Sequence, residues 1–319
     1  MTDIKSTKEY IELKQKFDSY YAEKLYPVLE KSDATRKRYV GFFVVLLLLA
    51  VVFFPLFLFY MMSGHVNDSS NGIILGVAGG LILLLCGPLY HCRKKVKPQI
   101  MPDFAGFFGA FSYTYEGTIN DAVLRQSGLF GKYNRNIGDD YFSGVYDDVR
   151  ISIAEEKLLD VKKDFRNNDI NQKVFGGVCI LFEMNKKFKG RTVVLKDRGA
   201  VGNALNKVQG LQNVKLESAE FEKYFEVYSD DQVEARYLLT TAFMERMLRL
   251  RDLYDGKSIQ FSFYQNTLLL SIPTNQNMFE ANSFFRTNTD KAKIDLVFEQ
   301  FYTIFSIVKL LKLNQRIGM

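Results

Sequence analysis

Histidine is nearly absent from this chain of 319 residues, and its two histidines lie where they exclude several kinds of catalytic site. His65 and His91 both fall in the first 97 residues, so the 222 residues that follow have none. The three cysteines, Cys86, Cys92 and Cys179, lack metal-ligand spacing and are typical of a reducing cytoplasm. Zinc sites and Ser-His-Asp or Cys-His nucleophilic sites are therefore excluded from the larger part of the chain. We expect no enzymatic activity and no cofactor.

Most of the chain also lacks an excess of basic charge, although the formal net charge is +6. Residues 1–97 carry 13 Lys or Arg against 8 Asp or Glu, whereas residues 98–319 carry 29 against 28. The larger part is thus nearly neutral and has no basic footprint of the kind that nucleic-acid binding requires. We expect no nucleic-acid partner.

Two uncharged apolar runs predict a transmembrane hairpin at residues 39–90. The first run, residues 39–62, would extend roughly 36 Å as a helix, enough to cross a hydrocarbon core about 30 Å thick. The second, residues 72–90, would extend roughly 28 Å, a minimal crossing. The alternative is a pair of buried helices in a soluble core, but such helices seldom stay apolar on every face for so long.

Basic residues flank both runs on the side away from the connecting loop, residues 63–71. They are Arg36, Lys37 and Arg38 before the first run and Arg93, Lys94, Lys95 and Lys97 after the second. The loop itself contains neither Lys nor Arg. The positive-inside rule then predicts a multi-pass protein with the loop outside and both termini in the cytoplasm.

Glycines form one face of the second apolar run. Gly72, Gly76 and Gly80 recur at every fourth residue, with Gly79 beside them. Small residues at this spacing allow two helix backbones to approach closely. We favour packing against the first helix of the same hairpin, and self-association into a homo-oligomer is the alternative.

The segment before the membrane, residues 1–38, contains an amphipathic helix at residues 7–31. Its aromatic and aliphatic residues recur at spacings of three and four, with Lys and Glu between them. Such a helix can lie on a membrane surface, but this one mixes charges of both signs. We therefore favour docking against the cytoplasmic domain.

Residues 98–319 predict one cytoplasmic α+β domain. Strands are expected at residues 109–116, 148–158, 174–184, 191–196, 258–264 and 267–272, and helices at 120–126, 220–228, 232–254 and 290–313. Gln265 and Asn266 predict a hairpin turn between the last two strands. Because the strands do not alternate with helices in a βαβ rhythm, the sheet should be mainly antiparallel and packed with helices.

Two acidic pairs are the only candidates for a metal site. Asp139-Asp140 and Asp147-Asp148 flank residues 141–146, and converging carboxylates can hold Mg²⁺ or Ca²⁺. Neighbouring residues on a strand point to opposite faces, however, so the pairs need not converge. We favour solvated turns and strand ends and assign no metal site, which leaves these four residues as a remote alternative.

One surface stretch, residues 185–191, is a candidate for binding an anionic partner. It connects two apolar strands and carries Lys186, Lys187, Lys189 and Arg191 around Phe188. Basic residues with an exposed aromatic suit a lipid head group or an acidic protein surface. The alternative is a charged hairpin turn that only keeps a sheet edge soluble.

Several segments resemble a bacterial membrane-protein family known as domain of unknown function 3137. The segments are YPVLEK before the two apolar runs, SGLFGKYN, DDYFSGVYDDVRISIAEEKL, FKGRTVVLKD and FEKYFEVYSDDQVEARYLLTTAFMERM. The resemblance implies a protein of the bacterial inner membrane with a large cytoplasmic domain. It implies no activity and no catalytic residues.

Together these observations favour a non-enzymatic interaction module anchored in the lipid bilayer, whose cytoplasmic domain binds a protein partner or the inner leaflet. A subunit of an oligomeric transporter or channel is the alternative. Neither apolar run contains an ionisable residue of the kind that ion pathways usually need, which weakens that alternative. A carboxylate-metal enzyme would depend wholly on the acidic pairs.

Overall fold

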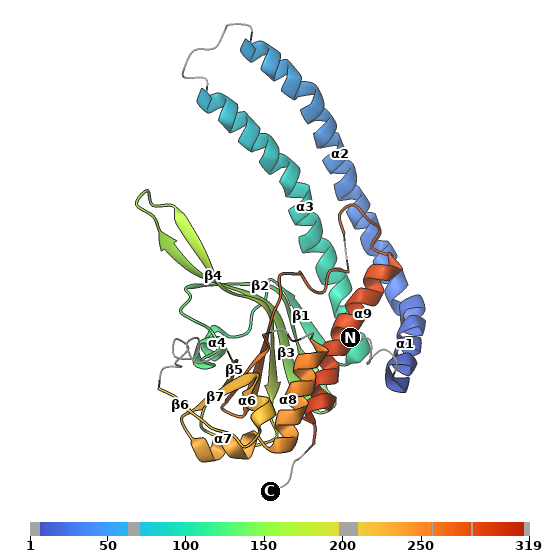
Figure 1. Ribbon diagram of the computed structural model, residues 1–319. Coiled ribbons are helices and arrows are strands. Elements are labelled where there is room, and N and C mark those ends of the chain that lie inside the picture. The colour runs from blue at the N-terminus through green and yellow to red at the C-terminus, as the bar shows by residue number, and fades with distance from the viewer. Residues whose placement is uncertain are drawn as a thin grey trace. The chain divides into compact units, whose positions relative to one another are not determined.

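The structure is a computed structural model in which residues 7–62, 71–197, 210–254, 256, 258–281 and 283–315 are described (Figure 1). Within α2 and α3, only the backbone is described at residues 56–58, 60–62, 71–78 and 81–83. The chain forms two compact units. One comprises Met1–Lys16, Ala105–Phe279 and Val297–Met319, and the other comprises Phe17–Phe104 and Glu280–Leu296.

Long helices dominate the second unit. Helix α1 (Lys8–Tyr20) continues through a π-helical turn, η1 (Tyr21–Leu25), into α2 (Tyr26–Met62), and α3 (Asn71–Phe108) runs back in the opposite direction (Figure 1). Within the described residues, one helical stretch, Lys8–Pro55, is long and apolar enough to cross a membrane. None of its most apolar 18 residues is buried in the protein, so it is not a core helix.

The predicted second crossing, residues 72–90, is helical throughout as part of α3. The structure describes only the backbone for most of the first half of this run. Residues 63–70 of the predicted outer loop lie outside the described residues. The helix also continues through Pro98 and Pro102 to Phe108, beyond the point where we expected the cytoplasmic domain to begin.

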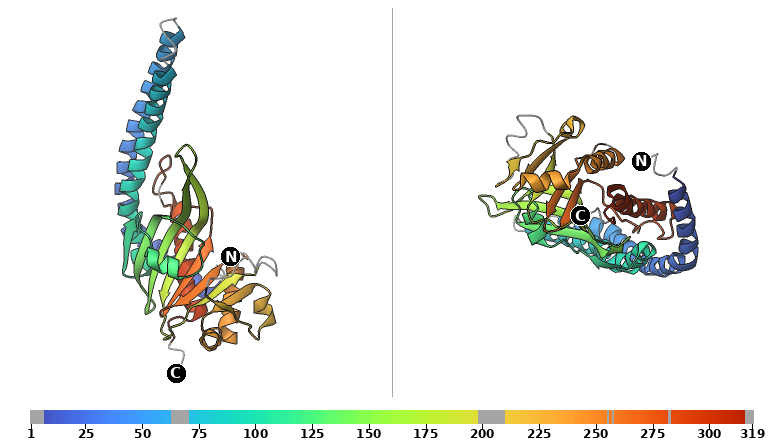
Figure 2. Two further views of the ribbon diagram at one scale, coloured as in Figure 1. Left: turned by 90° about the vertical axis from the view of Figure 1, so that its left-hand side faces the viewer. Right: turned by 90° about the horizontal axis from the view of Figure 1, so that it is seen from below.

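The first unit is built on an antiparallel sheet, which confirms the predicted α+β fold. Within the described residues nine strands pair in the order β1-β2-β3-β4-β9-β8-β5-β7-β6. Their bounds are β1 (Phe111–Tyr115), β2 (Arg135–Tyr146), β3 (Val149–Lys163), β4 (Asp169–Glu183), β5 (Thr192–Lys196), β6 (Gln212–Asn213), β7 (Phe225–Ser229), β8 (Gln260–Tyr264) and β9 (Thr267–Pro273). The end of the β3–β4 hairpin projects beyond the neighbouring strands (Figure 2).

Aromatic residues join one face of the sheet to α9 (Lys291–Leu311). The Phe301 ring lies 5.0 Å from Phe142 of β2 and 4.7 Å from Phe279, and the Phe305 ring lies 5.1 Å from Phe111 of β1. These residues recur at spacings of three and four on α9, so they share one face of the helix. The predicted closing helix at residues 290–313 is thus present and packs as its apolar stripe predicts.

The other face of the sheet packs against α4 (Asp121–Gln126), which matches the helix expected at residues 120–126. The Asn120 side chain accepts a hydrogen bond from the backbone N of Ala122, which satisfies a free donor of the first turn. Leu124 of this helix lies in a buried cluster with Ala154, Leu158 and Cys179. Cys179 is therefore a core thiol.

The predicted helix at residues 220–228 is wrong. Helix α6 (Ala219–Glu222) is a single turn, and residues from Phe225 onward form β7, which pairs with β5 along its whole length. The aromatic and β-branched residues of FEVYS fit a pleated sheet better than a helix. Local periodicity alone missed this because the pairing strand lies about thirty residues earlier in the chain.

The helix predicted at residues 232–254 is two helices, α7 (Gln232–Leu238) and α8 (Thr241–Leu253). Thr240 has an extended backbone and accepts a hydrogen bond through its hydroxyl from the backbone N of Phe243. Threonine side chains compete with the helix for backbone donors in this way, so Thr240 starts a new helix instead of continuing the old one.

Strand β2 (Arg135–Tyr146) was not among the predicted strands. The structure explains why residue 138 is a glycine: a Cβ at this position would lie 2.0 Å from the carbonyl oxygen of Gly117. Only glycine allows the segment before α4 to pass so close to the strand. The predicted hairpin turn is confirmed, with positive φ at both Gln265 and Asn266.

The beginning of the N-terminal helix packs against α9, in agreement with the docking that we favoured over binding to a membrane surface. Within the first unit the Tyr10 ring lies 5.0 Å from Tyr302 and 6.0 Å from Phe298, both on α9. Lys14 lies over the same Phe298 ring, and Lys309 of α9 pairs with Glu9. An aromatic cluster therefore covers the apolar side of residues 8–16.

Candidate functional site

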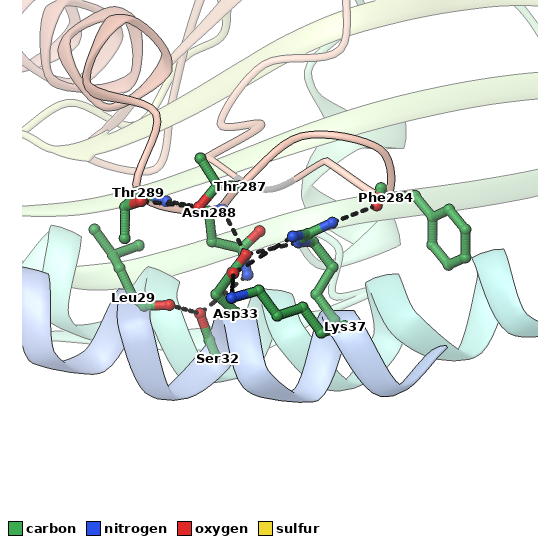
Figure 3. A network of polar contacts seen from close by, with 9 residues as sticks. Leu29, Ser32, Asp33, Lys37, Phe284, Thr287, Asn288 and Thr289 are labelled. Carbon is green, nitrogen blue, oxygen red and sulfur yellow. Dashed lines mark hydrogen bonds and ion pairs between the residues drawn. The ribbon is translucent and has the colours of Figure 1, made fainter. Parts of the chain in front are cut away.

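A buried polar network lies on α2 just before its apolar run, in the second unit (Figure 3). We call it the juxtamembrane network and define it by Ser32, Asp33, Arg36 and Asn288. The Arg36 Nε lies 2.6 Å from Asp33 Oδ1, and the backbone N of Asn288 donates to the same oxygen at 3.0 Å. The Asn288 side chain donates to Ser32 Oγ at 3.1 Å. All four residues are buried, so the network joins residues 280–296 firmly to α2.

Asp33 is ionised in this network. Burial alone would raise its pKa, but hydrogen bonds from Arg36 and from the Asn288 backbone, the charge of Arg36 and a bond from Lys37 together lower the pKa to about 2. Asp33 is only 5% exposed, and a buried carboxylate is stable only with such partners. The network thus holds a fixed charge pair and has no proton to exchange near neutral pH.

A second contact fastens the same segment to α3. The Glu280 Oε1 accepts from Lys97 Nζ at 2.8 Å and from Arg93 Nη2 at 2.5 Å. The side chain of Lys97 is completely buried. Two residues that we interpreted only as membrane-flanking charges therefore have a structural partner that lies more than 180 residues away in the chain.

Lys291 forms the third contact, at the other end of the segment. Its Nζ lies 2.7 Å from Asp18 Oδ1 and pairs with Asp295, and it lies over the Tyr21 ring at 4.9 Å. Residues 280–296 are thus held by ion pairs at Glu280 and Lys291 and by hydrogen bonds at Asn288. This arrangement positions a segment and does not resemble a catalytic site.

Sequence reasoning missed this network because its partners come from three distant segments. One signal was available: Asp33 is an acidic residue inside an otherwise basic flank, three residues before Arg36 on the same helix. Residues at this spacing are neighbours on a helix surface. The contribution of residues 280–296 has no local signature.

The acidic pairs behave differently from one another. Asp147 and Asp148 both have positive φ and form the exposed two-residue turn between β2 and β3, as the favoured interpretation predicts. For Asp140 that interpretation is wrong, because this residue is fully buried within β2. A β-bulge places Asp139 and Asp140 opposite the single residue Glu155 of β3.

This bulge produces an acidic cluster in which Asp139, Asp140 and Glu155 bring carboxylate oxygens within 4.8 Å of one another. Such oxygens suit a hard cation. However, Asp140 Oδ1 accepts from the hydroxyl of Tyr113 at 2.7 Å, and Glu155 Oε2 accepts from the backbone N of Met278 at 3.0 Å. Protein donors therefore occupy one oxygen of Asp140 and one of Glu155, and we assign no cation to the cluster. Asp147 and Asp148 do not join it.

The basic stretch at residues 185–191 is not the exposed hairpin that we expected. Strands β9 and β8 separate β4 from β5 in the sheet, so the stretch is a crossover connection. Phe188 is only 4% exposed and its ring lies 6.3 Å from Phe263, so the expected exposed aromatic is wrong. The aromatic side chain fills the core because the backbone around it is held inward.

Carboxylates hold that backbone. Glu234 accepts from the backbone N of Lys189 at 3.0 Å and of Gly190 at 2.6 Å, and Asp230 accepts from the backbone N of Arg191 at 2.7 Å. Successive backbone donors of this kind form a concave anion site, which the protein's own acids fill.

The basic side chains of the stretch are also partly engaged. Lys186 donates to the carbonyl of Tyr237, and the Arg191 guanidinium donates to the carbonyl of Gln126. Lys187 and Lys189 remain exposed. Two exposed lysines beside two acids are a weak attraction for an anionic surface.

The predicted glycine face is described only in part. The surroundings of Gly72 and Gly76 lie outside the described side chains. Among the described residues, no heavy atom lies within 4 Å of a Cβ placed on Gly79 or Gly80. Close packing inside the hairpin is therefore not seen at these two positions.

The first unit contains an open groove of about 1220 Å³ that sequence reasoning did not anticipate. Apolar residues of its wall include Phe130, Val174 and Leu195, and three lysines and one aspartate also line it: Lys132, Lys162, Lys173 and Asp160. Asp160 pairs with Lys162 at 3.0 Å, so the groove carries net positive charge.

Comparison with known proteins gives one family and one structure. Residues 173–313 match the family model described as "Protein of unknown function (DUF3137)", which confirms the resemblance inferred from the sequence. No curated protein matches the chain. A solved structure, the mycobacterial trehalose monomycolate transport factor A, TtfA, aligns over 68% of this chain and 96% of its own with 11% identity and a TM-score of 0.34. A TM-score this low does not establish a common fold.

Proposed function

We propose that this chain, whose residues 173–313 match the DUF3137 family, is a bacterial inner-membrane protein that acts by binding a protein partner and not by catalysis. In this proposal residues 39–62 and 72–90 both cross the membrane. The two termini and the α+β part lie in the cytoplasm, and residues 63–71 lie outside.

The observation that carries the proposal is the exposed apolar surface of α2. At least eleven large apolar side chains between Phe42 and Phe59 are exposed. Each of these side chains forgoes the favourable free energy of burial, and a soluble monomer rarely exposes so large a contiguous apolar surface. We therefore expect this surface to lie in an apolar environment. A bilayer supplies one along the whole helix.

A second crossing follows from the chain's path and charges. Helix α3 runs opposite to α2, and basic residues stand at the same end of both apolar runs. Of these, Arg38, Lys94 and Lys95 are exposed, which leaves them available to the anionic inner leaflet. A chain that crosses once would leave residues 72–90 in water.

Cysteine labelling in intact cells tests this topology. Cys92 and Cys179 are buried and Cys86 is exposed within the second apolar run, so unsubstituted protein measures the background that the native cysteines give. We expect Ser69→Cys to react with a membrane-impermeant maleimide from outside, and Ala242→Cys, exposed on α8, to react only after permeabilisation. The proposal would be contradicted if Ala242→Cys were labelled in intact cells. It would also be contradicted if Ser69→Cys stayed unlabelled both in intact cells and after permeabilisation of the outer membrane.

The groove of the first unit is the surface best suited to the partner. Strand β4 pairs with β9 only from Gly177 to Glu183, so within the described residues its first half has β3 on one side and no strand on the other. An open edge accepts an extended peptide through main-chain hydrogen bonds. With Lys162 paired, Lys132 and Lys173 favour an acidic peptide.

Site-specific cross-linking in cells tests partner binding. A photoreactive residue at Gln172, in the groove, should capture a second protein, whereas one at Glu245, exposed on α8, should not. The double change Lys132→Glu and Lys173→Glu should abolish the adduct, and Lys187→Glu should leave it. Adducts that contain only this chain would contradict the proposal and favour the oligomeric transporter alternative.

A further inference from the structure

The segment held by the juxtamembrane network carries two phenylalanines at the start of the apolar helix. The Phe43 ring lies 5.5 Å from the Phe284 ring and 6.0 Å from the Phe285 ring. Phe43 is the fifth residue of the apolar run at residues 39–62. The two phenylalanines therefore lie beside the first turns of the helix surface that we expect to lie in an apolar environment.

The backbone on both sides of Phe285 is fixed. Arg36 Nη1 donates to the carbonyl oxygen of Phe284 at 3.0 Å, and the backbone N of Asn288 donates to Asp33 at 3.0 Å (Figure 3). The Phe284 side chain extends from this position in the same view. The ring positions are thus set by buried charges, and the loop presents a defined surface.

The Phe285 side chain is 70% exposed. A phenylalanine ring exposed to water forgoes the favourable free energy of burial. The next residue, Arg286, is also exposed, with 73% of its side chain accessible. An apolar ring beside a cation matches the boundary between acyl chains and anionic head groups.

We propose that Phe284, Phe285 and Arg286 form a membrane-interface anchor, in which the Phe285 ring inserts among the upper acyl chains of the inner leaflet and Arg286 lies among lipid phosphates. The inference rests on the proposed function, because it takes α2 as a transmembrane helix. The inference goes beyond the proposed function because it assigns a third membrane contact to a segment that has no apolar run of its own.

A bilayer fits this surface better than a second protein does. The Phe285 ring lies against Phe43 on α2, and the neighbouring Phe42 is itself 57% exposed. Exposed Lys37 and Arg38 lie at the same end of that helix. The apolar surface therefore ends where basic charge begins, which is the order of polarity across one leaflet.

Tryptophan fluorescence provides a direct test, because the chain contains no tryptophan. Phe285→Trp introduces a single fluorophore into the full chain, which is then reconstituted into vesicles of phosphatidylethanolamine and phosphatidylglycerol. Lipids brominated near the head group and lipids brominated near the chain middle report depth, and iodide reports exposure to water. We expect blue-shifted emission, a greater loss of intensity with the shallow bromine than with the deep one, and little loss with iodide.

Phe53→Trp is the matched control within the apolar run, where Phe53 is 60% exposed. It should be quenched more by the deep bromine. Loss of that result would overturn the transmembrane assignment itself. If Phe53→Trp behaves as expected, quenching of Phe285→Trp by iodide, or by neither reagent, would overturn the interface anchor alone; quenching by neither reagent would indicate a protein contact.

Discussion

A buried carboxyl group in β3 should make the stability of the first unit depend on pH. Glu156 is 1% exposed, and its Oε1 accepts from the backbone N of Ile119 at 2.7 Å. Its Oε2 has no hydrogen-bond partner among the described residues. Burial, partly offset by the bond from Ile119 and reinforced by the charge of Asp121, raises its pKa from 4.5 to about 7. We therefore predict that Glu156→Gln stabilises the protein at alkaline pH.

The sign follows from the two states. The folded protein holds the Glu156 proton more tightly than the unfolded chain does. The contribution of Glu156 to the free energy of unfolding is therefore fully present below pH 4.5 and is lost as pH rises through 7. A difference of 2.5 pKa units at about 1.4 kcal/mol each gives about 3 kcal/mol as the largest expected loss. Glutamine resembles the protonated acid in shape and does not titrate. The variant should match the wild type near pH 4.5 and exceed it by up to about 3 kcal/mol at pH 8.5.

Thermal unfolding of the full chain in detergent at a series of pH values measures this difference. For a unit of this size, 3 kcal/mol corresponds to about 6–12 °C in Tm. Glu245→Gln, at an exposed position of α8, is the matched control and should shift Tm equally at all pH values. A Tm difference between wild type and Glu156→Gln that does not change with pH would refute the reasoning.

Three further substitutions test individual contacts. Asp33→Asn should cost about 3–5 kcal/mol, since it leaves a buried cation without its partner, and hydrogen exchange should show faster exchange at residues 284–289 than in wild type. Gly190→Ala should cost about 1–3 kcal/mol in chemical unfolding, because its Cβ would lie 2.6 Å from Glu234 Oε2, whereas Gly131→Ala meets only an ordinary contact at 3.7 Å and should be neutral. Tyr113→Phe removes the hydroxyl donor to a buried carboxylate and should lower stability by about 1–3 kcal/mol, with Tm as the readout.

Sequence reasoning succeeded where the cause is local. The length and uniform apolarity of residues 39–62 need no partner to be recognised, and the structure leaves that surface exposed. The turn at Gln265 and Asn266 follows from the short-range preference of two-residue hairpins for positive φ. The apolar stripe of α9 is likewise written into one helix, with a period of three to four residues.

It failed where a residue's environment is set by distant segments. Phe188 appeared to belong to a charged turn, but Glu234 and Asp230, some forty residues later, hold its backbone inward. Asp140 appeared to be a surface acid because no pattern in the sequence signals a β-bulge. The same holds for β7, whose strand character depends on its pairing with β5.

The ion pairs that hold residues 280–296 differ in when their partners become available during synthesis. Asp33 and Arg36 lie one helical turn apart and can pair as soon as α2 forms. Arg93 and Lys97 pair with Glu280, which is made more than 180 residues later. While the apolar runs insert, these two cations therefore carry uncompensated positive charge, which is what retention on the cytoplasmic side requires. Glu280 compensates one of the two charges only when the later segment docks, so in the proposed topology the same side chains first direct insertion and then hold the segment that carries Phe285.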